Sequence, residues 1–180
     1  TFSFGMVEGI VTGVALSILL LLFKAANPHM AVLGRIKGFT EYRNQKRFKD
    51  LEIWDHLLIV RIDAPYAFVN IQTIMEWILS EVDKKEGKLS KVIIDAGPVA
   101  YIDATGVEGV RDLMESLNKK GIELIFSEVI GPVRDAFHKN NLFSAKASEV
   151  FFMTTDEAVN YCISEEYKNH HADFAVQVNE

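Results

Sequence analysis

A long apolar stretch opens the chain, before any alternation of polar and apolar positions begins. It runs from Phe2 to Phe23 and contains one charged residue, Glu8. In a helix this stretch extends roughly 33 Å at about 1.5 Å per residue, enough for a hydrocarbon layer about 30 Å thick. The pattern predicts a transmembrane helix over residues 1–24. A buried helix of a soluble protein is the alternative.

One face of this predicted helix is made of small residues. Every fourth position is Gly or Ser, at Gly5, Gly9, Gly13 and Ser17. Small side chains let membrane helices approach closely, so we expect this face to pack against further helices, upstream in a longer polypeptide. Glu8 lies beside the face, where an acid usually points at protein or water. An interfacial position near the helix end is the alternative for Glu8.

After Pro28 the spacing of apolar residues changes repeatedly between the helical and the strand period. Residues 25–40 read as a linker. The expected strands are residues 40–45, 57–63, 91–96, 122–126 and 150–153, and the expected helices are residues 71–85, 106–120, 131–140 and 154–166.

This alternation predicts an α/β fold. We expect a mostly parallel sheet of about four or five strands packed by about four helices and preceded by one transmembrane helix. The domain should cover residues 41–167, and a flexible tail should follow over residues 168–180.

Charge is distributed unevenly along the chain. Residues 1–50 hold seven Lys or Arg and three acids, a net charge of +4, whereas residues 51–180 hold twelve bases and twenty-two acids, a net charge of −10. So acidic a domain excludes nucleic-acid binding, which needs a basic face. The bases follow the apolar run, which is the reverse of a signal peptide, and this predicts a domain on the cytoplasmic side of the cell (inner or plasma) membrane.

Few side chains in this sequence are candidates for catalysis or metal binding. Asp95 ends an expected strand and Asp103 follows eight residues later, so a paired-carboxylate or Mg²⁺ site is conceivable. No nearby His, Lys or Gly-rich loop completes such a site. The adjacent His170 and His171 have no partner ligand nearby in the sequence. Cys162 is the one cysteine, so no intrachain disulfide forms, and we expect it in the core. We therefore predict no enzyme activity, no cofactor and no metal.

The segment Ile102–Gly106 reads IDATG and resembles the Asp-x-Ser/Thr-Gly signature of STAS domains, named for sulfate transporters and anti-sigma-factor antagonists. Ala104 departs from the pattern, in which Ser is common, and leaves Thr105 as the matching hydroxyl. Further segments, in the same order, are similar to the SulP anion transporters. They are Pro28-His29, residues 31–35, Tyr42-Arg43, residues 58–70 (LIVRIDAPYAFVN) and residues 131–134 (GPVR).

The resemblance implies the last membrane helix and the cytoplasmic STAS domain of a SulP-type transporter of sulfate or a related anion. Such a domain would regulate transport and have no catalytic role. The implied partners are the membrane domain of the transporter, further protomers in a homo-oligomer and a cytoplasmic regulatory protein of unknown identity.

In free-standing STAS proteins the matching hydroxyl is phosphorylated, so the resemblance makes Asp103, Thr105 and Gly106 a candidate switch loop. The candidate partner-binding positions beside it are Tyr101, Ile102 and Ala104. A purely structural interpretation is also open, because Thr105 and Glu108 have the spacing of a capping box for the following helix.

Two other functions are weighed against the transporter domain. One is a stand-alone binding protein of the anti-sigma-factor-antagonist kind, controlled by phosphorylation. The other is a nucleotide-binding domain with a site near Asp95 and Asp103. Partition of the chain into a bilayer separates the first of these from the transporter domain, and calorimetric titration with nucleotide tests the second.

Overall fold

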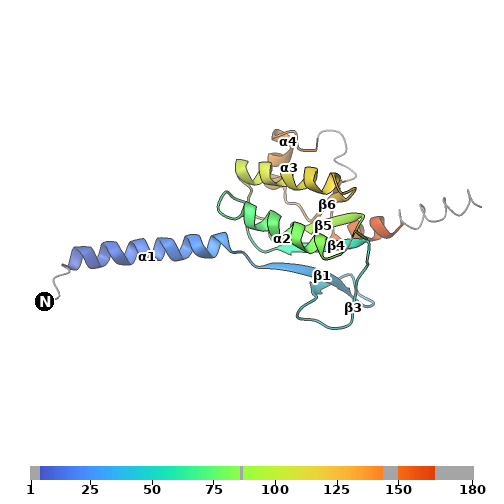
Figure 1. Ribbon diagram of the computed structural model, residues 1–180, viewed down its shortest axis with the longest axis horizontal. Helices are drawn as coiled ribbons and strands as arrows, with labels where there is room; N and C mark the ends of the chain where they lie inside the picture. The colour runs from blue at the N-terminus through green and yellow to red at the C-terminus, as the bar shows by residue number, and fades with distance from the viewer. Residues whose placement is uncertain (1–4, 86, 144–149, 165–180) are drawn as a thin grey trace, which may run out of the picture.

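A computed structural model describes residues 5–85, 87–143 and 150–164. In Figure 1 a single long helix projects from a compact α/β body. The elements are α1 (Met6–Ala26), β1 (Met30–Ile36), β2 (Tyr42–Asn44), β3 (Leu51–Glu52), β4 (Leu57–Ile62), α2 (Ile71–Asp83), β5 (Lys91–Asp95), α3 (Ala104–Asn118), β6 (Glu123–Ser127), α4 (Gly131–Lys139) and β7 (Phe151–Phe152). Residues 155–164 form one more helical segment. The predicted flexible tail, residues 168–180, lies outside the described residues, as do His170 and His171.

The strands form one sheet in the order β2-β1-β4-β5-β6-β7, with β3 also paired to β1. Strands β4 to β7 are parallel to one another, and β1 runs antiparallel to β2, β3 and β4. The predicted α/β class is confirmed. The sheet is larger than expected, with seven strands, because β1 and the two-residue β3 did not stand out in the sequence.

Strand β1 corrects the prediction of a linker over residues 25–40. Its residues Met30–Ile36 pair through Ala31 and Val32 with β4, next to the middle of the sheet. The nearby Pro28, Gly34 and Gly38 are typical of loops and concealed the strand. Gly34 has a packing reason, since a Cβ there would lie 2.9 Å from Leu51 Cβ on the paired strand β3.

Two hydrophobic layers cover the sheet. On one face, α2, α3 and α4 pack on alternate strand residues such as Val60, Ile94 and Phe126. On the other face, helical residues 155–164 place Ala158, Val159 and Cys162 on Ile59, Ile93 and Ile125. Cys162 is fully buried, which confirms the prediction that it belongs to the core.

Helix α1 is not part of either layer. Residues Val7–Ala26 have a mean hydropathy of 2.1, are long and apolar enough to cross a membrane, and are 0% buried against the rest of the chain. A helix that packed into a soluble core would be mostly covered. The alternative of a buried soluble helix is therefore contradicted by the packing.

Candidate functional site: the switch loop and its link to the apolar helix

The candidate switch loop lies between β5 and α3, at the start of α3. Asp103 is the residue that caps α3: its Oδ1 accepts a hydrogen bond from the Gly106 N–H at 2.7 Å. Its other oxygen, Oδ2, accepts one from the Phe68 N–H at 2.9 Å. One carboxylate thus holds the first turn of α3 and the loop before α2 together.

The capping box expected from Thr105 and Glu108 is not formed. Helix α3 starts at Ala104, so Thr105 already lies inside its first turn and is exposed. Glu108 instead forms an ion pair with Arg111, with 3.2 Å between Oε2 and Nε. Asp103 takes the capping position because its short carboxylate sits just before the first helical residue, where the N–H groups of that turn need an acceptor.

The remaining loop residues differ in their accessibility. Tyr101 is 56% exposed and Ala104 is exposed, so both are available to a partner. Ile102 is only 6% exposed and forms a parallel bridge with Tyr66 in the core. The prediction that Ile102 contacts a partner is therefore not supported, and it serves to anchor the loop.

Gly106 allows the loop to lie close to its neighbour. A Cβ at this position would come within 2.5 Å of the Tyr66 carbonyl oxygen, which is backbone and cannot rotate away. The Tyr66 carbonyl also accepts the Asp103 N–H at 3.1 Å, and the Tyr66 N–H donates to the Tyr101 carbonyl at 3.0 Å. The switch loop is thus bonded along its length to the segment before α2.

Asn70 links that segment to α1. Its side-chain Nδ2 donates to the Ala25 carbonyl at the end of α1, at 3.1 Å, and to the Pro65 carbonyl at 3.0 Å. Its Oδ1 accepts the Ala67 N–H at 3.0 Å, and the residue is only 3% exposed. Residue-by-residue reasoning missed this role. The available signal was the segment Phe68-Val69-Asn70, which belongs to the resemblance with the SulP transporters.

The small-residue face predicted on α1 is open. Within the described residues nothing would meet a Cβ placed on Gly9 or Gly13, and Ser17 Oγ donates to the Gly13 carbonyl at 2.8 Å. At the start of the helix the Glu8 carboxylate folds back toward Gly5. The face therefore presents little more than backbone, and its role in helix packing stays a prediction.

A separate polar cleft of about 530 Å³ lies near the carboxyl ends of β4, β5 and β6. Its lining includes Arg61, Asp95 and Glu128. Burial raises the pKa of the Asp95 carboxyl; the Gly97 N–H opposes the rise, and Glu128 adds to it. Asp95 accepts the Gly97 N–H of its own loop, whereas Asp103 accepts the Gly106 N–H of α3 and the Phe68 N–H of the loop before α2. In the described part of the chain, no group of three or more His, Cys, Asp or Glu residues is arranged to hold a metal ion.

The chain is similar in sequence to a known domain family and to known proteins. The family model of the STAS domain matches residues 49–158. The probable sulfate transporter 4.2 of Arabidopsis thaliana is 34% identical over 172 residues, covering 91% of this chain and 25% of that protein. The alignment leaves about 16 of the 180 residues uncovered, which is fewer than the 26 residues up to the end of α1. The similarity therefore includes part of α1. The chain spans about a quarter of the length of the curated relatives it matches.

Solved structures share the fold. The murine Solute Carrier 26 family member A9 anion transporter, in its inward-facing state, matches with a TM-score of 0.78 and 19% identity over 87% of this chain and 25% of that one. The STAS domain of a SulP transporter from Vibrio cholerae matches with a TM-score of 0.53 and 15% identity, over 68% of this chain and 93% of that one. The family model over residues 49–158 shows that the chain belongs to the STAS domain family, and the curated relatives named above are sulfate transporters.

Proposed function

We propose that this chain is the last transmembrane helix and the cytoplasmic regulatory STAS domain of a SulP-type transporter of sulfate or a related anion. The observation that supports this most directly is the join between α1 and the domain. An uncovered apolar helix is hydrogen-bonded through the Ala25 carbonyl to the buried Asn70 of the STAS body. Transport itself belongs to a membrane domain outside this chain, and the STAS domain has no catalytic role.

The charge pattern supports the cytoplasmic side. Lys24 ends the apolar run, and more bases follow in the next 25 residues. These bases are Arg35, Lys37, Arg43, Lys46, Arg47 and Lys49. Positive charges on one side of a membrane helix keep that side in the cytoplasm. The membrane domain, a second protomer and a cytoplasmic regulatory protein are the partners that this arrangement would serve.

Insertion of α1 is the first test. The chain is reconstituted into phospholipid vesicles and then extracted with alkaline carbonate. We expect the parent chain to stay with the lipid. Leu16→Arg places a charge near the helix centre, at a cost of about 2.5–3.5 kcal/mol, and should release a large fraction. Phe39→Arg makes the same kind of change on the domain and should release none. Full extraction of the parent chain would support the stand-alone binding protein instead.

We further propose that the Thr105 hydroxyl is the phosphoacceptor of a regulatory switch. It is exposed, and it lies two residues after the carboxylate that holds the Phe68 and Gly106 N–H groups. A phosphate adds about −1.5 to −2 charges and would repel the Asp103 carboxylate. The loop joined to α1 through Asn70 would then loosen, which gives the modification a route to the membrane helix.

Amide hydrogen exchange tests this switch. Thr105→Glu should speed amide exchange at the Phe68 and Gly106 N–H groups relative to Thr105→Gln. The Gln side chain is as large as the Glu side chain but uncharged. Thr105→Ser should exchange like the parent. Equal rates in the Glu and Gln variants would mean that charge at this position does not act on the loop, and that Thr105 is only a structural residue of the helix.

A further inference from the structure

Three uncharged loop segments follow β4, β5 and β6 at one edge of a strongly acidic domain. The acids at this edge, Asp63, Asp95, Asp103 and Glu128, flank these segments. Residues 64–70, 96–102 and 129–133 contain no Asp, Glu, Lys, Arg or His, in a chain of which 24% is charged. Since β4, β5 and β6 are parallel, their carboxyl ends lie at the same edge of the sheet. Each loop exposes one large apolar side chain there, and these are Phe68, Tyr101 and Ile130.

This edge, which we term the apolar edge, is the one from which α1 leaves the body. The Asp63 N–H, just past the end of β4, donates to the His29 carbonyl at 3.0 Å, and Asn70 bonds the Ala25 carbonyl. In Figure 1, α1 joins the body at the start of β1, which pairs with β4 there. A membrane crossed by α1 would thus lie over the apolar edge.

Phe68 continues the apolar side of α1 itself. It is 70% exposed, and together with Val69 it borders a groove of about 740 Å³. The helix side of the groove is Leu16, Leu19, Leu20, Leu22, Phe23 and Ala26. Leu16 lies near the middle of the segment that is long enough to span a bilayer, and the other five lie in its C-terminal half. In a membrane crossed by α1, Phe68 would therefore lie at the depth of the interface and outermost hydrocarbon.

We propose that the apolar edge contacts the lipid bilayer, with the Phe68 side chain inserted beside α1. The inference rests on the proposed function, because it requires α1 to span the membrane. The groove side of α1 is built from Leu and Phe, whereas close helix packing in membranes uses small residues, so lipid is the better occupant. Phe inserts readily at the headgroup boundary, and Tyr is enriched there.

Site-directed spin labelling of the reconstituted 180-residue chain tests the contact. A nitroxide is attached to cysteine in Phe68→Cys, and its collisions with oxygen and with a water-soluble nickel chelate are measured in phosphatidylcholine–phosphatidylglycerol vesicles. Phe39→Cys is the matched control, since Phe39 is 63% exposed and lies past the far end of β1. Leu20→Cys, 70% exposed, reports α1 itself. The buried native Cys162 is checked by labelling the parent chain.

We expect the oxygen-to-nickel collision ratio to be several-fold higher at position 68 than at 39, and highest at 20. A high ratio at 20 with an aqueous ratio at 68 overturns the lipid contact and leaves the membrane helix in place. Low collision rates with both reagents at 68 also overturn it, since they mean that protein covers the site. An aqueous ratio at 20 refutes the proposed function and the inference together.

Discussion

Asp103 is the residue that joins the parts of the candidate site by hydrogen bonds. The matching family signature suggests Thr105 as the chemically active residue. Thr105, however, is exposed in the first turn of α3, whereas Asp103 accepts two backbone N–H groups from different segments. An acceptor that serves a helix start and a neighbouring loop fixes their separation. The Asp of the signature therefore has a structural role, holding these two segments together, that does not depend on phosphorylation.

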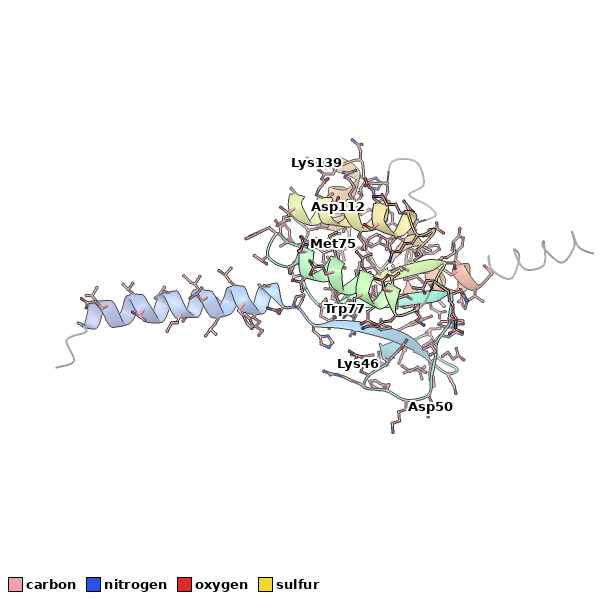
Figure 2. All side chains as sticks on the ribbon, in the orientation of Figure 1. Lys46, Asp50, Met75, Trp77, Asp112 and Lys139 are labelled. Atoms are coloured by element: carbon pink, nitrogen blue, oxygen red, sulfur yellow. The ribbon has the colours of Figure 1, made fainter. Side chains whose placement is uncertain are left out.

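Removing the Asp103 carboxylate should cost measurable stability. Asp103→Ala leaves the Gly106 and Phe68 N–H groups without their acceptor, and we expect a loss of about 1–3 kcal/mol. Asp103→Asn keeps an oxygen for one of them and should lose less. Asp112→Ala, on the exposed face of the same helix (Figure 2), should stay within about 0.5 kcal/mol. Urea unfolding measures all three, and equal losses in Asp103→Ala and Asp112→Ala would refute the role.

Asp95 should make stability depend on pH. Its raised pKa means that the folded chain holds this proton more tightly than the unfolded chain. The stability contributed by protonation is complete below the ordinary carboxyl pKa and is lost as the pH rises through the raised one. Asp95→Asn keeps an oxygen for the Gly97 N–H, so it should be more stable than the parent at neutral pH, with a difference that shrinks in acid. Thermal melts across pH measure this.

Asp55→Asn removes one negative charge at an exposed position and serves as the control for net charge. The stability of this variant relative to the parent should not change with pH in the way expected for Asp95→Asn. If Asp95→Asn were less stable than the parent at neutral pH, burial of the charged form would not be the dominant effect at Asp95.

At the scale of elements, the Thr-x-x-Glu spacing of a capping box occurs at the start of two helices, and only one of the two capping boxes is formed. Thr154 and Glu157 have the Thr-x-x-Glu spacing of a capping box in the sequence and form one: the Glu157 N–H donates to Thr154 Oγ1 at 3.1 Å, and the Thr154 N–H donates to Glu157 Oε2 at 3.3 Å. Thr105 and Glu108 have the same spacing but lie inside α3. The difference is Asp103, which starts the helix two residues earlier than the spacing alone implies.

The packing of α3 against the segment before α2 depends on Gly106. Gly106→Ala would drive a Cβ into the Tyr66 carbonyl, so we expect a loss of about 1–3 kcal/mol, despite the better helix propensity of Ala. Gly131→Ala is the matched control, because it too lies in a first helical turn and nothing lies within 4 Å of a Cβ there. Denaturant unfolding measures the free energy of unfolding of both variants. Equal stabilities would show that α3 and the segment before α2 can move apart without loss of stability.

At the scale of the whole molecule, the body should fold without α1. A chain starting at Asn27 keeps β1. Asn70 loses its Ala25 acceptor but keeps its bond to the Pro65 carbonyl. We expect it to be soluble, monodisperse and cooperative in thermal unfolding, as circular dichroism and size-exclusion chromatography can measure. Insoluble aggregate from this chain would contradict the separation of helix and domain.

A chain starting at Glu41, the predicted domain boundary, is the informative comparison. It lacks β1, so the backbone groups of β4 that pair with Met30, Ala31 and Val32 lose their partners. Strand β4 then becomes an unpaired edge strand. Unpaired strand edges promote aggregation, so this shorter chain should precipitate or unfold. If it behaved like the chain starting at Asn27, β1 would be dispensable, and residue 41 would be an adequate boundary.

The sequence by itself determined the features that depend on local pattern. The apolar run of α1, the parallel strands and their helices, and the capping box at Thr154 all follow from the spacing of residues near one another in the chain. The IDATG segment was also found by sequence, through its resemblance to STAS domains. Such features need no knowledge of which segments meet in space.

The tertiary structure decided what depends on contacts between distant segments. Residues Met30–Ile36 form strand β1 because β4 supplies its partners, although Gly34 and the flanking Pro28 and Gly38 favour a loop. Asp103 joins the start of α3 to the loop before α2 because Phe68, 35 residues earlier, offers it a second N–H group. The apolar edge exists because three loops, separate in sequence, end neighbouring parallel strands. Backbone hydrogen bonds and packing are satisfied between such segments only once the chain has folded, so no local pattern could reveal them.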